Sequence, residues 1–192
     1  MATEANQIKW YFSIKQAIMT LDEHNREACT RLYDAIRFQY RQSPGSSGNH
    51  QAWYGGYLDH VSEMINIGMV MYYALNEKRK LPFTHVDIIL VALLHDIEKP
   101  WRFCSDEELA KGSKADRAQF RDQIIAQYNI RLTNEQRNAI KYVEGEGPDY
   151  TNGQRIMGPL AAFCHAADTL SARMWHDRPL INEESWGQRE EY

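Results

Sequence analysis

Apolar residues recur along this chain at steps of three and four, which is the spacing of one face of a helix. No segment shows the clear apolar–polar alternation of a strand. Two apolar stripes near the N-terminus consist of Trp10, Ile14, Ala17, Ile18 and Leu21, and of Ala28, Leu32, Ala35, Ile36 and Tyr40. Further helices are expected over residues 57–76, 86–98, 115–128 and 157–175. The pattern predicts an all-α protein.

Polar residues mark where some of these helices begin. Thr84 is expected to cap the helix over residues 86–98. Thr133 and Gln136 have the spacing of a capping box, in which each side chain binds the other residue's backbone N–H. A further helix is therefore expected to begin after Thr133 and to end at the GEGP of residues 145–148.

The largest break in the helical pattern is RQSPGSSGNHQAWYGG, residues 41–56, which is rich in small and loop-forming residues. We expect residues 1–54 to form N-terminal helices and a loop that pack on a helical core over residues 55–176. Residues 177–192 are polar and include a proline, so a loosely packed tail is expected there. The whole chain is predicted to be a single all-α domain.

Composition narrows the class of protein further. The 192 residues are 43% hydrophobic and 25% charged, with a formal net charge of -4, so no basic field covers the whole protein. Binding of duplex nucleic acid is therefore not expected. The three scattered cysteines form no CxxC motif, the N-terminus lacks a secretion signal, and no apolar run reaches the length of a membrane span. These features predict a soluble cytoplasmic protein with free thiols.

The stretch VALLHDIEKP places His95 and Asp96 at the end of an apolar run. A buried histidine alone is often a core residue bonded to a backbone carbonyl group. The neighbouring carboxylate changes this, because a buried Asp needs a cation or several hydrogen-bond donors.

Two more polar residues lie on apolar helical faces. His60 shares its face with apolar residues at steps of four, three and four, namely Met64, Ile67 and Met71. Asp168 lies on a stripe of mostly small and apolar residues, namely Ala161, Cys164, Ser171 and Trp175. With His95 and Asp96, two imidazoles and two carboxylates from three segments point inward. Such a set suits one divalent ion (Mn, Fe, Co, Ni or Zn) better than Ca²⁺.

With these residues in place, the sequence resembles the HD-domain superfamily of metal-dependent phosphohydrolases, over roughly residues 55–175. The motifs that carry the resemblance are GGYLDHV, HDIEK and HAADTLSARM. The resemblance implies a helical bundle with one divalent ion held by His60, His95, Asp96 and Asp168. The segment GGYLDHV resembles the motif before the first helix in one branch of this superfamily, a branch that is often found with OB-fold nucleases.

One departure from this family concerns a second metal. Binuclear members carry two more histidines, whose counterparts in KYVEGEGPDY are Val143 and Glu144. Between Asp96 and Asp168 the chain has only His165, so a single metal is predicted. Glu144 is either a solvated residue, a base that orients water, or a weak ligand of a second site.

The resemblance also implies roles in catalysis, with attack of metal-bound water on phosphorus. Asp96 would bind the metal and orient this water, while Lys99 would neutralise phosphate charge. The alternative for Lys99 is a cation that balances the helix dipole. Arg102 and Arg173 are predicted to contact phosphate, although Arg173 could instead pair with an acid. Glu98 is expected at the surface, with a general acid as its alternative.

Three further groups of residues are expected to serve the surface, the packing or the assembly of the protein. Lys111, Lys114, Arg117 and Arg121 alternate with acidic residues, which predicts a solvated surface of mixed charge. Aromatic side chains next to motifs usually serve packing, with base stacking as the alternative for Trp53, Tyr54 and Trp101. Extra apolar surface on the helix over residues 57–76 favours a homodimer, from Met64, Met69, Met71 and Tyr72.

The sequence thus predicts a metal-dependent phosphohydrolase that acts on a small phosphate ester, with a nucleotide as the expected substrate and no membrane partner. One alternative is a metal-stabilised nucleotide-binding or sensor module with little turnover, which the missing second-site histidines favour. The other is a nuclease for single strands, which the motif GGYLDHV favours. No strands of an OB fold are visible in the first 54 residues.

Overall fold

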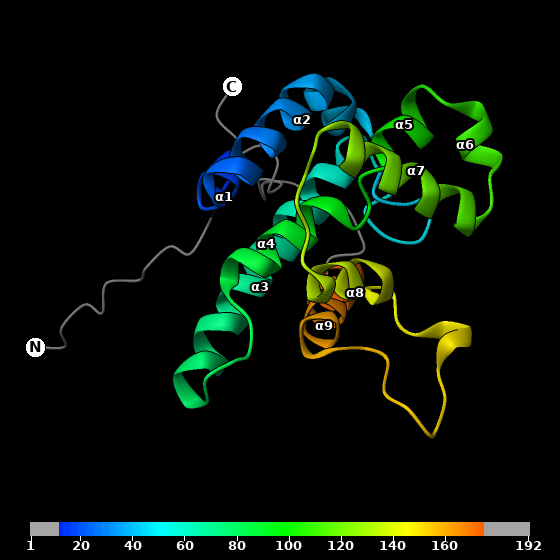
Figure 1. The fold of residues 1–192 in the computed structure, drawn as a ribbon. Coiled ribbons are helices and arrows are strands. Elements are labelled where there is room, and N and C mark those ends of the chain that lie inside the picture. The colour runs from blue at the N-terminus through cyan, green and yellow to red at the C-terminus, as the bar shows by residue number, and fades with distance from the viewer. Residues whose placement is uncertain (1–11, 175–192) are drawn as a thin grey trace, which may run out of the picture.

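The computed structural model describes residues 12–174 and confirms the all-α class, with no strand in this range. Figure 1 shows the long α3 beside α4, with α1 and α2 at one end of this pair, α8 and α9 next to each other, and α5, α6 and α7 grouped to one side. In chain order the helices are α1 (Ile14–Met19), α2 (Glu23–Gln42), α3 (Gly56–Lys78), α4 (His85–Leu94), α5 (Lys99–Cys104), α6 (Glu107–Lys111), α7 (Lys114–Gln127), α8 (Asn134–Tyr142) and α9 (Pro159–Met174). A short 3-10 helix, η1 (Gly147–Asp149), lies between α8 and α9.

Side-chain caps start several of these helices. The capping box predicted at Thr133 and Gln136 is present and begins α8. Thr84 precedes α4, and its box with Asp87 confirms the expected start of that helix. Ser113 caps α7 in the same way. Each box satisfies backbone N–H groups that the first helical turn leaves without partners.

A single hydrophobic core joins the N-terminal helices to the rest of the chain. Helix α4 is its centre, because all seven residues from Ile88 to Leu94 are buried. Helix α3 packs against α4 and α9, and α2 packs against α3 and α5. Within residues 12–54, α1 and α2 contribute side chains such as Ile14, Leu32 and Tyr40 to this core. Residues 1–11 and the expected tail over 177–192 lie outside the described range.

The chain departs from helical structure earlier than the sequence suggested. The helix expected over residues 86–98 ends at Leu94, and residues 95–98 form a turn before α5. Pro100 explains this, because its ring would clash with the carbonyl of residue 96 in a continuous helix and it has no N–H to donate. It is instead accommodated in the first turn of α5. His95 and Asp96 therefore lie on a turn at the end of α4.

Smaller differences concern single positions. Ala35, expected on the apolar stripe of α2, is exposed, whereas Ile36 and Tyr40 are buried as expected. Helices α5 and α6 were not among the helices expected from the sequence. The stripe residues Trp10 and Trp175 lie outside the described range.

Much of the apolar surplus on α3 belongs to the core. Met64 and Met69 are fully buried, and Met71 and Tyr72 are partly buried against the core. The homodimer stays a prediction, and the burial of these residues leaves less exposed apolar surface on α3 to support it. All three cysteines are free thiols. Within residues 12–174, no helix combines the length and the apolar character that crossing a membrane requires.

Gly56 provides a sharp test of how the loop meets the start of α3. A Cβ at this position would lie 1.8 Å from the backbone oxygen of Gln51, so Gly56→Ala forces two backbone segments apart. We expect the free energy of unfolding to fall by about 2–3 kcal/mol, measured by urea denaturation. Gly48→Ala is the matched control, because nothing lies within 4 Å of the added carbon. Equal stability of both variants would contradict this packing.

Candidate metal centre

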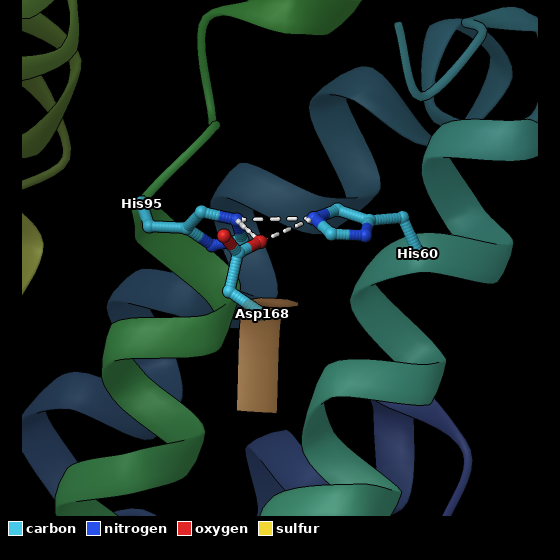
Figure 2. Close-up of side chains that lie close together, drawn as sticks. All are labelled: His60, His95 and Asp168. Carbon is cyan, nitrogen blue, oxygen red and sulfur yellow. Dashed lines mark hydrogen bonds and ion pairs between the residues drawn. The ribbon is translucent and has the colours of Figure 1, made fainter. Parts of the chain in front are cut away.

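Three side chains from separate elements converge at one point in the interior. His60 comes from α3, His95 from the turn after α4, and Asp168 from α9, as Figure 2 shows. The two Nε2 atoms are 3.3 Å apart, and Oδ1 of Asp168 lies 3.1 Å from Nε2 of His60 and 3.8 Å from that of His95. One ligand atom from each residue lies within 4.8 Å of the others. The sequence prediction that these three residues meet is confirmed.

The hydrogen bonds of the two histidines determine which nitrogen faces the site. Nδ1 of His95 lies 2.9 Å from the carbonyl oxygen of Ala92, which can only accept, so Nδ1 carries the proton. Nδ1 of His60 lies 3.0 Å from the hydroxyl oxygen of Ser171, which itself donates to Glu63 over 2.7 Å. The hydroxyl therefore accepts from His60. Both Nε2 atoms then direct lone pairs into the site.

This donor set fits a cation. Two facing imidazole lone pairs and a carboxylate repel one another in a buried space unless a positive charge lies between them. His60 and His95 are 0% and 1% exposed, whereas the side chain of Asp168 is 17% exposed. Two nitrogens and a carboxylate oxygen suit Zn or another divalent transition ion.

Asp96 lies at the edge of this cluster. Its Oδ2 atom is 3.2 Å from Nε2 of His95, 3.7 Å from Nε2 of His60 and 2.5 Å from Nζ of Lys99. The side chain is thus placed between the three clustered residues and a buried lysine. All four residues predicted to bind the metal lie together, and their role as ligands stays a prediction.

A buried polar network behind His60 was not anticipated from the sequence. Glu63 accepts hydrogen bonds from Ser171 and from the side-chain amide of Gln51, over 2.7 and 2.8 Å. The same amide donates to the backbone oxygen of Ser171 over 2.9 Å. Gln51 is fully buried and has a φ of 40°, a left-handed conformation that a non-glycine residue adopts at a cost. The carboxylate–serine pair fixes the orientation of the His60 ring.

The spacing of these partners was a usable signal. Glu63 lies three residues after His60 and Ser171 three after Asp168, so each shares a helical face with a site residue. Gln51 had no such signal, because it lies in the loop over residues 43–55. The same loop contributes His50, whose ring centroid is 5.5 Å from that of His60. Burial, followed by the nearby His60 and Lys99, lowers the pKa of His50 to about 4.

The site holds a proton when it holds no metal. Burial lowers the pKa of His95, but the carboxylates of Asp96 and Asp168 outweigh it and raise this pKa to about 9. Burial also lowers the pKa of His60, and there it prevails. The pKa of Asp96 lies well below its usual value despite burial, because Lys99 and His95 stabilise its negative form. At neutral pH one proton on His95 therefore supplies positive charge to the cluster.

A cavity of about 360 Å³ opens beside His95 and Asp96. The predicted residues Lys99, Arg102 and Glu144 line this cavity. Lys99 is buried and donates to the backbone oxygen of Gly45 over 2.5 Å, so its side chain has a fixed partner in the loop before α3. Glu144 is exposed and pairs with Lys114. Arg173 is exposed in the last turn of α9 and is not among the residues that line the cavity.

Two charged features differ from expectation. Lys114, Arg117 and Arg121 line the cavity, and their spacing of three and four along α7 was the signal for a shared face. Lys111 is on the exterior and pairs with Glu107, as a solvated surface predicts. Glu98 is buried, so the expected surface position is wrong. Burial and the neighbouring Asp96 raise the pKa of Glu98 to about 7.

The other residues considered for the site have structural contacts. The indole N–H of Trp53 donates to Asp59 over 2.9 Å, and Trp101 packs edge-on against Phe120. Tyr54 is 74% exposed. His165 contacts the backbone oxygen of Val143 through Nδ1, over 2.6 Å, and is not a member of the three-residue cluster.

We expect Ser171→Ala to weaken metal binding about ten- to a hundredfold while the fold is kept, because the His60 ring loses the partner that orients it. Titration with Mn(II) or Zn(II) followed by calorimetry measures the affinity. The control is Ser62→Ala, a second buried serine near His60, whose hydroxyl has no partner in the described part of the chain. Equal affinities of the two variants would show that Ser171 does not support the ligand.

Metal binding should release a proton at pH 7, because the raised pKa of about 9 leaves His95 protonated in the metal-free protein. Between pH 7 and 9 the apparent affinity should rise about tenfold per pH unit. The same shift from 6.5 to about 9 stabilises the metal-free fold fully below pH 6.5, and this contribution is lost as the pH rises through 9. Calorimetry in two buffers of different ionisation enthalpy measures the proton count, and a count of zero would contradict this assignment.

A search of protein-family models finds none that matches this chain, and searches of curated proteins and of solved structures find no similar protein. Membership of the HD-domain superfamily therefore stays a prediction from the motifs. What the structure adds is the convergence of His60, His95 and Asp168. The chemistry of this centre must be inferred from its own side chains and the cavity beside them.

Proposed function

We propose that this protein is a metal-dependent phosphohydrolase that acts on a phosphate ester, most simply a nucleotide. The observation that carries this proposal is the position of the cluster of His60, His95 and Asp168 next to a cavity whose wall, of mixed charge, includes Lys99 and three arginines. A metal site alone is compatible with many functions. A metal site that borders a cavity lined by Lys99 and arginines favours a substrate with phosphoryl groups.

The size of the cavity supports a small substrate. A volume of about 360 Å³ lies within the range of pockets that bind small molecules, about 300–1,000 Å³. A nuclease for single strands would need a groove that follows a backbone over several nucleotides. We therefore favour a single nucleotide over a strand.

Different residues of the site would bind the metal ion and neutralise the phosphate during hydrolysis. His60, His95 and Asp168 would hold the ion, with Asp96 beside them. When bound, a divalent ion lowers the pKa of a coordinated water and polarises phosphate oxygens. Lys99 lies 2.5 Å from Asp96 and lines the cavity, so its ammonium group can turn from this carboxylate to a phosphate oxygen.

Glu98 is suited to protonate the leaving oxygen. Hydrolysis adds water across the P–O bond, so the leaving oxygen must gain a proton as this bond breaks. The pKa of Glu98 is raised to about 7, its side chain lines the cavity, and its Oε2 atom has no hydrogen-bond partner in the described chain. A carboxyl group in this state can give up a proton near neutral pH. This raises the general-acid alternative above the surface role.

A nucleotide-binding module with little turnover is the second candidate. It is favoured by the contacts of Lys99, whose ammonium group already binds both Asp96 and the backbone oxygen of Gly45 over 2.5 Å each. If these two contacts persist when a nucleotide is bound, the ammonium group of Lys99 cannot also neutralise the negative charge that develops on the phosphate oxygens. Ligand-induced rise of the melting temperature without phosphate release would favour this candidate.

Incubation of the purified protein with Mn(II) and a panel of nucleotides should release phosphate. Lys99→Ala should keep the metal, measured by elemental analysis, and lower kcat/KM about a hundredfold or more, because phosphate charge loses its cation. Lys111→Ala is the matched control, an exposed lysine outside the cavity. Parental activity in Lys99→Ala would remove the lysine from the mechanism. No phosphate release from the metal-loaded parent would remove the phosphohydrolase itself.

A further inference from the structure

Three buried polar atoms in the wall of the cavity have no hydrogen-bond partner within residues 12–174. They are Nε of Arg102, Nε of Arg121 and Oε2 of Glu98. A buried donor or acceptor without a partner destabilises the folded protein, because it has lost its hydrogen bonds to water. Native proteins keep such groups where a ligand satisfies them or where strain serves function. Three of them around one cavity therefore indicate a ligand with complementary atoms.

The charges around the cavity show which kind of ligand this is. Three lysines of the wall have carboxylate partners, in the pairs Lys99–Asp96, Lys114–Glu144 and Lys141–Asp149. Arg102, Arg117 and Arg121 form no ion pair with an acidic side chain in the described part of the chain. Burial, and then repulsion from the nearby Arg117, lower the pKa of Arg102, and the carboxyl groups of Glu98, Asp96 and Glu144 offset this shift only in part. An anion would relieve this repulsion.

Other contacts keep two of the arginines in position. Nη1 of Arg121 donates to the backbone oxygen of His95 over 2.7 Å, and Nε of Arg117 donates to the backbone oxygen of Ser113 over 3.2 Å. Arg121 is thereby tied to the segment that carries the metal cluster. Each guanidinium keeps further N–H groups for a ligand, and its planar shape matches two oxygens of a phosphate.

We propose that Arg102, Arg117 and Arg121 form a second anion subsite, which binds a phosphate group that is not the one cleaved. The preferred substrate then carries at least two phosphates, as nucleoside diphosphates and triphosphates do. One phosphate lies at the metal cluster near Lys99, and the next lies against the three arginines across the cavity. That the ligand is a substrate rests on the proposed phosphohydrolase function. The subsite itself is an anion-binding site, and its affinity can be measured without turnover.

The binding test uses inorganic pyrophosphate and calorimetry, with protein freed of divalent metal because pyrophosphate chelates such ions. The double variant Arg102→Gln/Arg117→Gln should raise the Kd for pyrophosphate at least tenfold. Arg121 is left in place, because it also holds the backbone of His95. Arg137→Gln, an exposed arginine on α8 outside the cavity, is the matched control and should leave this Kd unchanged. An unchanged Kd in the double variant, with its fold verified by circular dichroism, overturns the subsite.

The kinetic test compares a nucleoside diphosphate with the matching monophosphate in the Mn(II)-loaded protein. The double variant should lose at least ten times more kcat/KM on the diphosphate than on the monophosphate. Equal losses on both substrates overturn the subsite and leave the phosphohydrolase standing. Pyrophosphate binding that needs the arginines, in a protein that hydrolyses neither substrate, overturns the phosphohydrolase and leaves the anion subsite standing.

Discussion

Two imidazole lone pairs face each other across 3.3 Å in the buried interior, and this arrangement needs a positive charge between them. The need arises because each histidine has its other nitrogen committed, His95 to a backbone carbonyl and His60 to Ser171. Neither ring can turn away without leaving a buried donor unpaired. In the metal-free protein, the raised pKa of His95 supplies the charge as a proton. A divalent ion would take the same place.

Helical packing supplies the rigidity that such a cluster requires. From Ile88 to Leu94 helix α4 is apolar and buried, and it ends directly before His95, so the turn after it is held by a buried segment. Helices α3 and α9 flank it and carry His60 and Asp168. The loop over residues 43–55 then closes the site at two points. Gln51 donates to Glu63 in the network behind His60, and the backbone oxygen of Gly45 accepts from the ammonium group of Lys99. The N-terminal part of the chain is thus a component of the site.

Beside the cluster of His60, His95 and Asp168 lies the cavity, whose charged wall comes from sequence segments that do not indicate a binding site when each is considered alone. Along α7, cations alternate with acids in a way that is typical of a solvated helix. Packing turns one face of this helix toward Glu98 and Arg102, where Arg117 and Arg121 form no ion pair with an acidic side chain in the described part of the chain. This face of α7 forms part of the cavity wall because of the residues that lie opposite to it.

The sequence by itself determined the all-α class, most helix positions and the convergence of His60, His95 and Asp168. Helical periodicity reports local structure, and a charged group on an apolar face is costly enough to indicate a partner. Only the tertiary structure decided the network around His60, since Glu63 and Ser171 are 108 residues apart, and it likewise decided the burial of Glu98 and the place of Arg117 and Arg121 in the cavity wall. It also placed Arg173 outside that wall, although this arginine follows Asp168 by five residues. These outcomes depend on which elements meet in space, and the spacing of residues along one helix does not say which other element packs against it.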